Sequence, residues 1–314
     1  MTQRLATQTP LESVWNVIFL CLVILIFFFL VSPLLVILPL SFNKEPYFTF
    51  SWAMFDFSRD MSGTRAGCDA YNSLRWYCDL FTSRSWGIAT LNSFGISLAS
   101  TLIATALGTI AALGLSRPKM PFRSAVMAIL LTPMIIPLII SALALYSFFS
   151  LPLVDLVLPA FLDPYISEEL REFRLAKSYL GIILSHVILG TPFVVITVTA
   201  TLSVFDVTMI RAAQSLGAGF WRTFFRVVVP LIMPGVISGA LFAFVTSFDE
   251  VVIVWFLADA TQVTLPVKMY TGLREQISPT IMSVAVILIL MSTSLMFFLE
   301  ALRRRGQQQR GADV

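Results

Sequence analysis

The sequence predicts an all-α, polytopic membrane protein, and two observations carry this prediction. The first is composition: 57% of the 314 residues are hydrophobic and only 12% are charged, with a mean hydropathy of +0.86, outside the range of ordinary soluble domains. The second is the recurrence of apolar runs of about 20 residues, the length that a helix needs to cross roughly 30 Å of hydrocarbon. Six such runs predict six transmembrane helices in a single domain over residues 1–314, at about 14–40, 91–115, 123–150, 178–204, 231–257 and 281–302.

The first run is expected to stay in the mature protein. It is longer than a secretory apolar region, no small-residue cleavage site follows it, and further spans come after it. Orientation follows from the basic residues, because short cytoplasmic segments hold an excess of Lys and Arg. The short segments on one side of the predicted topology are nearly free of acids, and both termini are therefore expected in the cytoplasm. The basic residues of that side are Arg4, Arg117, Lys119, Arg123, Arg211, Arg222, Arg226, Arg303, Arg304, Arg305 and Arg310.

Two of the predicted spans contain residues with alternative interpretations. The prolines of "TPMIIP", Pro133 and Pro137, either break the span at 123–150 or only kink it. His186, the only histidine of the chain, lies inside the span at 178–204. An intramembrane histidine can carry a proton or contact a ligand, but more commonly it bonds a neighbouring helix.

The insert at about 41–90 is expected on the extracytoplasmic side. It contains Cys68 and Cys78 in "GCDAYNSLRWYCDL", and nearby thiols outside the cytoplasm tend to form a disulfide. The alternative is two free thiols with no role. A zinc site is not expected, because no second pair of cysteines or histidines accompanies them. Cys21, inside the first span, is assigned to packing.

No motif of enzymatic chemistry is present, so the chain is not expected to be an enzyme. The four lysines, Lys44, Lys119, Lys177 and Lys268, do not follow a glycine, which rules out a phosphate-binding loop of the G-x-x-x-x-G-K-[ST] type. One histidine cannot supply both a metal site and a catalytic triad. We expect no metal, no nucleic-acid partner and no cofactor bound to this chain.

A polar, glycine-interrupted segment at about 205–230 separates two predicted spans. Within "DVTMIRAAQSLGAGFWRTFFR" apolar residues recur at helical offsets of three and four, which predicts a short amphipathic helix. Gly217 and Gly219 are expected to break it, and its small residues allow another protein to approach closely. The alternative is a helix in the headgroup layer with its arginines on lipid phosphates.

Asp249 and Glu250, in "SFDEVV", lie in the outer half of the span at 231–257. Ionisable groups at that depth are costly and tend to face a cavity or a partner. Both are candidates for a cation pathway, although adjacent residues point about 100° apart on a helix, so only one can face the centre squarely. The alternative is that they cap the end of the span.

The segment at 205–230 resembles the EAA loop of binding-protein-dependent ABC importer permeases. The matching residues are Ala212, Ala213, Gly217, Val227, Val229 and Pro230, while Arg211 replaces the leading Glu of the motif. The stretches at 191–218, 248–258 and 264–281 are similar to the second permease of spermidine/putrescine importers. Over about 90–302, the chain is therefore identified as a member of the ABC importer permeases.

This resemblance implies a type I ABC importer permease in the bacterial inner membrane, with the EAA loop as a coupling helix that docks on an ATPase. The residues expected to couple are Arg211, Ala212, Ala213, Leu216, Gly217 and Phe220. The implied partners are a second permease subunit, two copies of a cytoplasmic ATPase that binds ATP and Mg, and an extracytoplasmic substrate-binding protein.

The acidic pair favours a polyamine, such as putrescine or spermidine, as the imported substrate. An amino acid, an organophosphonate or ferric iron is the alternative within the same superfamily. From a different class, an ion-coupled secondary transporter would share the hydropathy but would be expected to show inverted repeats, and it would have no use for the segment at 205–230.

Overall fold

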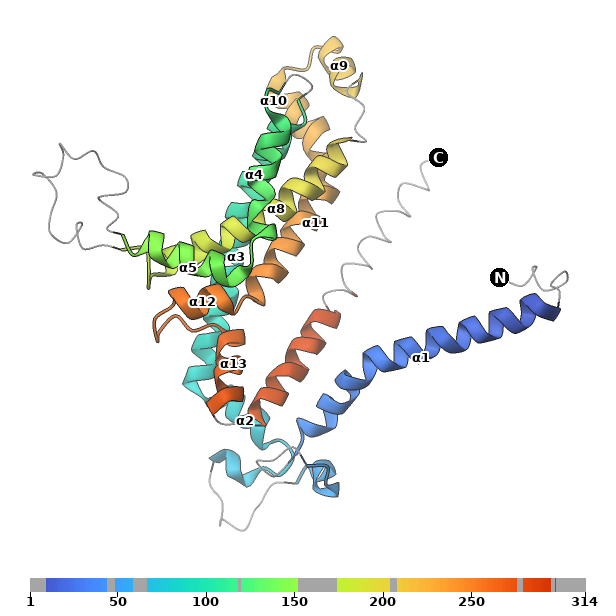
Figure 1. Ribbon diagram of the computed structural model, residues 1–314, viewed down its shortest axis with the longest axis vertical. Helices are drawn as coiled ribbons and strands as arrows, with labels where there is room; N and C mark the ends of the chain where they lie inside the picture. The colour runs from blue at the N-terminus through green and yellow to red at the C-terminus, as the bar shows by residue number, and fades with distance from the viewer. Residues whose placement is uncertain are drawn as a thin grey trace, which may run out of the picture. The chain divides into compact units, whose positions relative to one another are not determined.

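The computed structural model describes the chain in several stretches, and all of its regular secondary structure there is helical, as the sequence predicts. These stretches form two compact units, one from Met1–Ser83 with Gly272–Val314 and the other from Arg84–Thr271. Figure 1 shows the elements of both. The described residues are 10–43, 49–58, 67–117, 120–151, 174–203, 208–275, 279–294 and 297.

Four described helices are long and apolar enough to cross a membrane. They are Val14–Leu40 within α1 (Pro10–Leu40), α3 (Arg84–Leu115), α8 (Tyr179–Ser203) and the continuous helix Phe220–Phe248. A bent pair, α4 (Arg123–Ile135) and α5 (Leu138–Phe149), makes a fifth candidate span. The sixth predicted span begins as the helix Thr280–Ser294, which is shorter than a span. Except for Phe297, the rest of 281–302 lies outside the described residues, as does most of the insert at 151–177.

The span predicted at 123–150 is broken, which is the first of the two alternatives for its prolines. α4 and α5 meet at an angle of 103°, and Figure 1 shows this corner in green. Ile136, between the two helices, is extended at φ −70° and ψ 134°. A residue before proline avoids the helical region, and Pro137 has no N–H with which to continue the helix. Pro133 lies inside α4, so the break is at the second proline.

The prediction of one helix at 231–257 is wrong at both ends. The helix begins earlier, as α10 (Phe220–Thr223), a π-helical turn η4 (Phe224–Val228) and α11 (Val229–Phe248) in succession. Pro230 does not start the span, because proline is tolerated within the first turn of a helix and the preceding turn continues into α11. The helix ends at Phe248, and a separate helix α12 (Val252–Leu257) follows.

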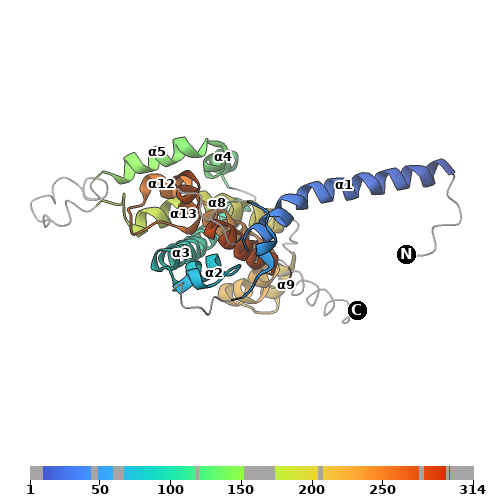
Figure 2. The same ribbon diagram turned by 90° about the horizontal axis from the view of Figure 1, so that it is seen from below.

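The core of the second unit is the packing of α3, α8 and α11 through small residues (Figure 1 and Figure 2). Gly190 of α8 lies against Ala104 of α3 and Ala243 of α11. Gly239 of α11 lies so close to α8 that an added Cβ would be 2.7 Å from the Cα of Val194. Small residues let helix backbones approach closely, which is how helices associate where lipid removes the hydrophobic driving force between them.

The outer end of the second unit is held by polar side chains of α3. The Asn92 amide donates to the carbonyl oxygens of Thr261 and Val263, at 2.9 and 3.0 Å. The Ser93 hydroxyl accepts from the N–H of Leu265, at 2.7 Å, where α13 (Leu265–Glu275) begins. These bonds fix the connection between α12 and α13 against the start of α3.

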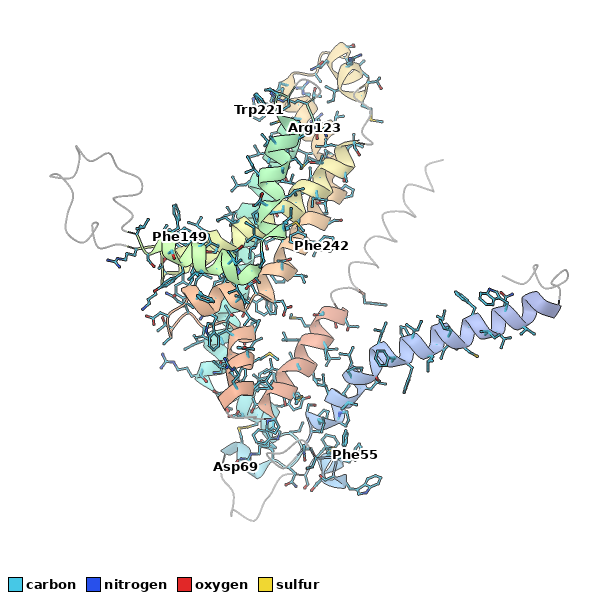
Figure 3. The ribbon with its side chains drawn as sticks, viewed as in Figure 1. Phe55, Asp69, Arg123, Phe149, Trp221 and Phe242 are labelled. Atoms are coloured by element: carbon cyan, nitrogen blue, oxygen red, sulfur yellow. A yellow bond between two sulfur atoms is a disulfide. The ribbon has the colours of Figure 1, made fainter. Side chains whose placement is uncertain are left out.

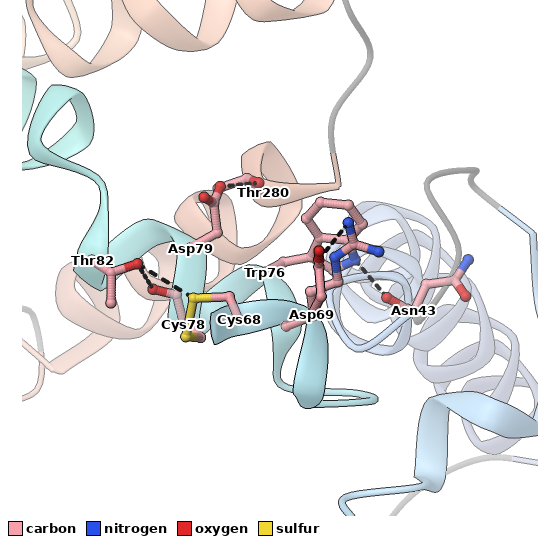
Figure 4. A network of polar contacts seen from close by, with 9 residues as sticks. Asn43, Cys68, Asp69, Trp76, Cys78, Asp79, Thr82 and Thr280 are labelled. Atoms are coloured by element: carbon pink, nitrogen blue, oxygen red, sulfur yellow. Dashed lines mark hydrogen bonds and ion pairs between the residues drawn. A yellow bond between two sulfur atoms is a disulfide. The ribbon is translucent and has the colours of Figure 1, made fainter. Parts of the chain in front are cut away.

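The first unit contains a folded insert that is tied to the end of α1 (Figure 4). Its helix α2 (Arg75–Thr82) carries Trp76, whose indole N–H donates to the carbonyl oxygen of Asn43 at 2.6 Å. Tyr77 bonds the hydroxyl of Ser41 at 2.8 Å, and burial raises the pKa of its phenol above the ordinary value of 10.0. The phenol therefore stays protonated at neutral pH and can donate in this bond.

Two further links hold α2 within the insert. The structure pairs Cys68 with Cys78, with the Cα atoms 5.4 Å apart, as is usual for a disulfide. Thr280, at the start of the later apolar helix, donates to a carboxylate oxygen of Asp79 at 3.0 Å (Figure 4). The insert is thus bonded to the end of α1 and to the start of the helix Thr280–Ser294.

Candidate functional site

The EAA-like segment folds as a helix, a tight turn and a second helix. The helix α9 (Thr208–Ser215) ends where the N–H of Ala218 bonds the carbonyl of Ala213 at 3.0 Å and the N–H of Gly217 bonds that of Gln214 at 2.9 Å. This pair of bonds is a Schellman motif, which requires a left-handed residue after the helix. Gly217 is that residue, with φ +81°. The glycine of the motif is therefore needed for the shape of the turn.

Gly219 has a different role from Gly217. It is extended, with φ −68° and ψ 167°, and precedes α10, whose first turn closes with a bond from the N–H of Thr223 to the carbonyl of Gly219 at 3.0 Å. The predicted break at two glycines is found in the structure. One glycine ends the first helix and the other begins the next.

Most of the predicted coupling residues lie on the exposed side of this segment. Arg211, Ala212 and Gly217 are exposed, and the side chains of Leu216 and Phe220 are 89% and 70% exposed. Ala213 differs: it is half-buried, on the same helical face as Ile210, which packs against the buried core cluster of the second unit. The segment thus rests on the bundle through Ile210 and presents Ala212 and Leu216, one turn apart, outward.

A largely exposed aromatic cluster adjoins this segment, and of its four rings only Phe220 was predicted to contact a partner. Phe220 stacks on Phe224 and Trp221 stacks on Phe225, with ring centroids 6.4 and 6.0 Å apart. Figure 3 shows Trp221 at the α10 end of this helix. Arg222 and Arg226 are exposed among the rings. The run "FWRTFF" was the available signal, because aromatic and basic residues together mark the edge of a membrane span.

The two candidate pathway acids do not share a helix, because α11 ends before them. The backbone N–H of Asp249 closes the last turn of α11 on Val245, at 3.0 Å, and Asp249 is exposed. Glu250 is buried, and its carboxylate accepts the N–H of Ile253 at 2.9 Å, in the first turn of α12. A carboxylate on the free N–H groups of a helix start is a cap. The Glu250 carboxylate thus caps α12, and only Asp249 is exposed.

His186 bonds a neighbouring helix, which is the second of the two alternatives for this residue. Its Nδ1 lies 2.6 Å from the hydroxyl of Ser247, so that the pair joins α8 to α11. Ser247 follows Gly235, Gly239 and Ala243 at intervals of four residues on the face of α11 that packs on α8. The start of this stripe, "GVISG" at 235–239, is a G-x-x-x-G pattern that predicts helix packing, a signal that the sequence analysis did not use.

A bundle of apolar helices with an exposed helix and turn at one end defines the class of the protein as a multi-pass helical membrane protein. The chain belongs to the family described as binding-protein-dependent transport system inner membrane components, whose model matches residues 104–307. It is therefore a multi-pass inner-membrane subunit of an ABC importer. This membership excludes the ion-coupled secondary transporter.

Several relatives match most of the chain. The spermidine/putrescine transport system permease protein PotC of Haemophilus influenzae is 25% identical over 90% of this chain and 94% of its own length. The putrescine transport system permease protein PotI of Escherichia coli is 29% identical over 96% of this chain and 95% of its own. The molybdenum transport system permease protein ModB of Haemophilus influenzae is 28% identical over 71% of this chain and 96% of its own.

A solved structure shows the same fold. A bacterial alginate ABC transporter, crystallised with an alginate-bound periplasmic protein, contains a chain that matches at a TM-score of 0.65 with 18% identity, covering 94% of this chain and 96% of that one. Together with the family match, this likeness establishes the type I permease architecture that the sequence predicts.

Proposed function

We propose that this chain is the permease subunit of an ATP-driven importer of polyamines, such as putrescine or spermidine, or of a related cationic amine. The observation that carries the proposal is the similarity to two polyamine permeases over 90% and 96% of the chain. The similarity to the molybdenum permease extends over 71%, so it leaves more of the chain without a counterpart.

The proposed complex contains a second permease subunit, two copies of a cytoplasmic ATPase and an extracytoplasmic substrate-binding protein. The chain has no phosphate-binding loop, so its energy must come from a contact, with ATP and Mg bound by the ATPase. The proposed contact is the outward face of α9 and its turn, where Ala212 and Leu216 are exposed. ATPase closure would push on this segment and shift the permeases between inward- and outward-facing states.

The orientation of the proposed complex follows from the positive-inside rule, with both termini in the cytoplasm. On this orientation the segment with the exposed Ala212 and Leu216 faces the cytoplasm, where the proposed ATPase would bind. The insert of the first unit and Asp249 then lie toward the extracytoplasmic side.

Asp249 is the proposed pathway acid. A polyamine carries at least two positive charges, and negative groups along its route offset the loss of hydration. Replacing Asp249 with Asn should lower cation uptake per assembled complex on the order of tenfold. Glu250→Gln is the matched control, because its remaining carbonyl oxygen can still accept the N–H of Ile253. Unchanged uptake by Asp249→Asn would contradict the pathway role.

The substrate is tested by uptake into proteoliposomes that hold the complex co-purified from native membranes with the tagged chain. Radiolabelled putrescine and spermidine should accumulate with ATP and the binding protein, and molybdate and alginate oligosaccharide should not. Accumulation of a non-amine alone would replace the substrate while leaving the permease assignment in place. If no ATPase co-purifies, the proposed complex is wrong.

A further inference from the structure

An exposed aromatic surface lies in the insert of the first unit, apart from the proposed coupling and pathway residues. Phe50, Trp52, Phe55 and Phe57, here called the aromatic patch, belong to the short segment around η1 (Trp52–Phe55). Their side chains are 66%, 90%, 66% and 56% exposed. The rings of Trp52 and Phe55 lie with their centroids 6.3 Å apart. Four exposed aromatic side chains within residues 50–57 would be costly to leave in water, and exposed apolar side chains gathered in this way mark an interaction surface.

The buried Met54 and the exposed Asp56 anchor the segment to the rest of the insert. Met54, between Trp52 and Phe55, is 3% exposed. The carboxylate of Asp56, the only charged group in 49–58, accepts the Asn72 amide at 2.8 Å and the N–H of Ser58 at 3.1 Å. Within this described stretch, the charge is held by the insert and the aromatic rings point outward.

Both ends of the segment are held at the end of α1. The Asn43 amide donates to the carbonyl oxygen of Thr49 at 2.8 Å, and the ring of Phe57 packs edge-on against Phe42 at 5.7 Å. Asn43 is itself fully buried, with Trp76 bonded to its carbonyl. Phe42 and Asn43 follow Leu40, the last residue of α1, so the patch begins where that span leaves the hydrocarbon. Figure 3 shows Phe55 beside this end of α1.

We infer that the aromatic patch inserts into the interfacial layer of the bilayer around the end of α1, with phospholipid as its partner. α1 is apolar along its length, with a hydropathy of 3.2, and its last residue, Leu40, is the only buried one among residues 14–40. The patch extends the apolar surface of α1 into the interfacial layer of the bilayer. This is the depth at which Trp side chains and the apolar rings of interfacial segments are favoured. The insert is thereby held both by its bonds to α1 and by lipid.

The test is lipid quenching of the Trp52 fluorescence in the full complex, reconstituted in phosphatidylcholine/phosphatidylglycerol nanodiscs. The Trp52 signal is the difference between the wild type and Trp52→Phe, which keeps an apolar ring. Lipids brominated near the headgroup should lower this difference signal about twofold or more, and lipids brominated near the chain end should lower it less. Aqueous iodide should have little effect.

Trp15→Phe is the matched control, because Trp15 is 65% exposed within the span α1 and its difference signal should respond to brominated lipid whatever the insert does. Two results would overturn the inference. Quenching of the Trp52 signal by iodide and not by brominated lipid would place the patch in water. Protection from iodide only after the substrate-binding protein is added would make it a protein-docking surface instead.

Discussion

Two glycines, Gly239 in the bundle core and Gly217 in the EAA-like segment, are required for opposite physical reasons. At Gly239 the backbone is an ordinary helix, but an added Cβ would lie 2.7 Å from the Cα of Val194 on the facing helix. At Gly217 no atom lies within 4 Å of an added Cβ, but φ is +81°. At Gly239 a side chain has no space, and at Gly217 a residue with a Cβ disfavours the required backbone conformation.

The two parts of the permease are therefore stabilised by different kinds of interaction. The helices α3, α8 and α11 are held by close packing over their length, so a steric change there must move whole helices. The turn after α9 is stabilised by two backbone hydrogen bonds and by the left-handed conformation of Gly217. A substitution there is therefore expected to disturb the turn without moving the helices of the bundle. Because its conformation does not depend on the packing of the bundle, the turn could adjust to a partner protein without disturbing the helices.

Gly239→Ala should have the largest effect, a loss of about 1–3 kcal/mol of stability, because the methyl group overlaps α8. Thermal unfolding of the detergent-purified protein, followed by size-exclusion chromatography, measures it. Gly95→Ala, in α3, is the matched control, since nothing lies within 4 Å of its added Cβ; it should be neutral or slightly stabilising. Equal melting temperatures for the two variants would contradict the close packing of α11 on α8.

Gly217→Ala should cost about 1–2 kcal/mol, confined to the turn, because a left-handed backbone disfavours any residue with a Cβ. We expect faster proteolysis at 208–219 and weaker ATPase stimulation, with the melting temperature of the bundle unchanged. Gly219→Ala is the control: its φ is −68° and its Cβ also has open space, so it should be tolerated. A bulky residue at Gly217 would be a poor docking test, because backbone strain and steric blocking would act together.

Leu216→Ala should reduce co-purification of the ATPase about tenfold without altering the turn. Leu216 is 89% exposed, and burial of a leucine side chain against a partner stabilises by about 1.5–3 kcal/mol. Leu102→Ala, an exposed leucine of the apolar helix α3, controls for the loss of apolar area. Unchanged ATPase yield from Leu216→Ala would remove this side chain from the proposed contact.

Arg211→Glu should have the smallest effect. It restores the acid that the EAA motif carries, at a position where the side chain is exposed, and substitutions of exposed residues usually change stability by no more than about 0.5 kcal/mol. Transport within about twofold of the wild type is the expected result. A larger loss would show that Arg211 has its own partner in the complex.

The sequence by itself determined the class of the protein and the approximate place of its elements. Apolar length predicted the helices because hydrocarbon leaves backbone groups no alternative partner. The A-A-x-x-x-G pattern located the helix and turn at 208–219, because a small set of turn residues encodes that geometry locally. A disulfide between Cys68 and Cys78 was favoured from spacing and predicted compartment, and the structure decides it against two free thiols.

Only the tertiary structure decided where helices break and which side chains are free. Hydropathy does not distinguish Pro137, at which a helix ends in a corner, from Pro230, which lies within a continuous helix, because both prolines lie in apolar runs. Nor can it tell that the Glu250 carboxylate is used to cap α12 while Asp249 beside it stays exposed. Such assignments depend on which backbone groups each side chain meets in the folded chain. The exposed rings of the aromatic patch depend on the fold too, since bonds to Asn43 and Asn72 orient that segment.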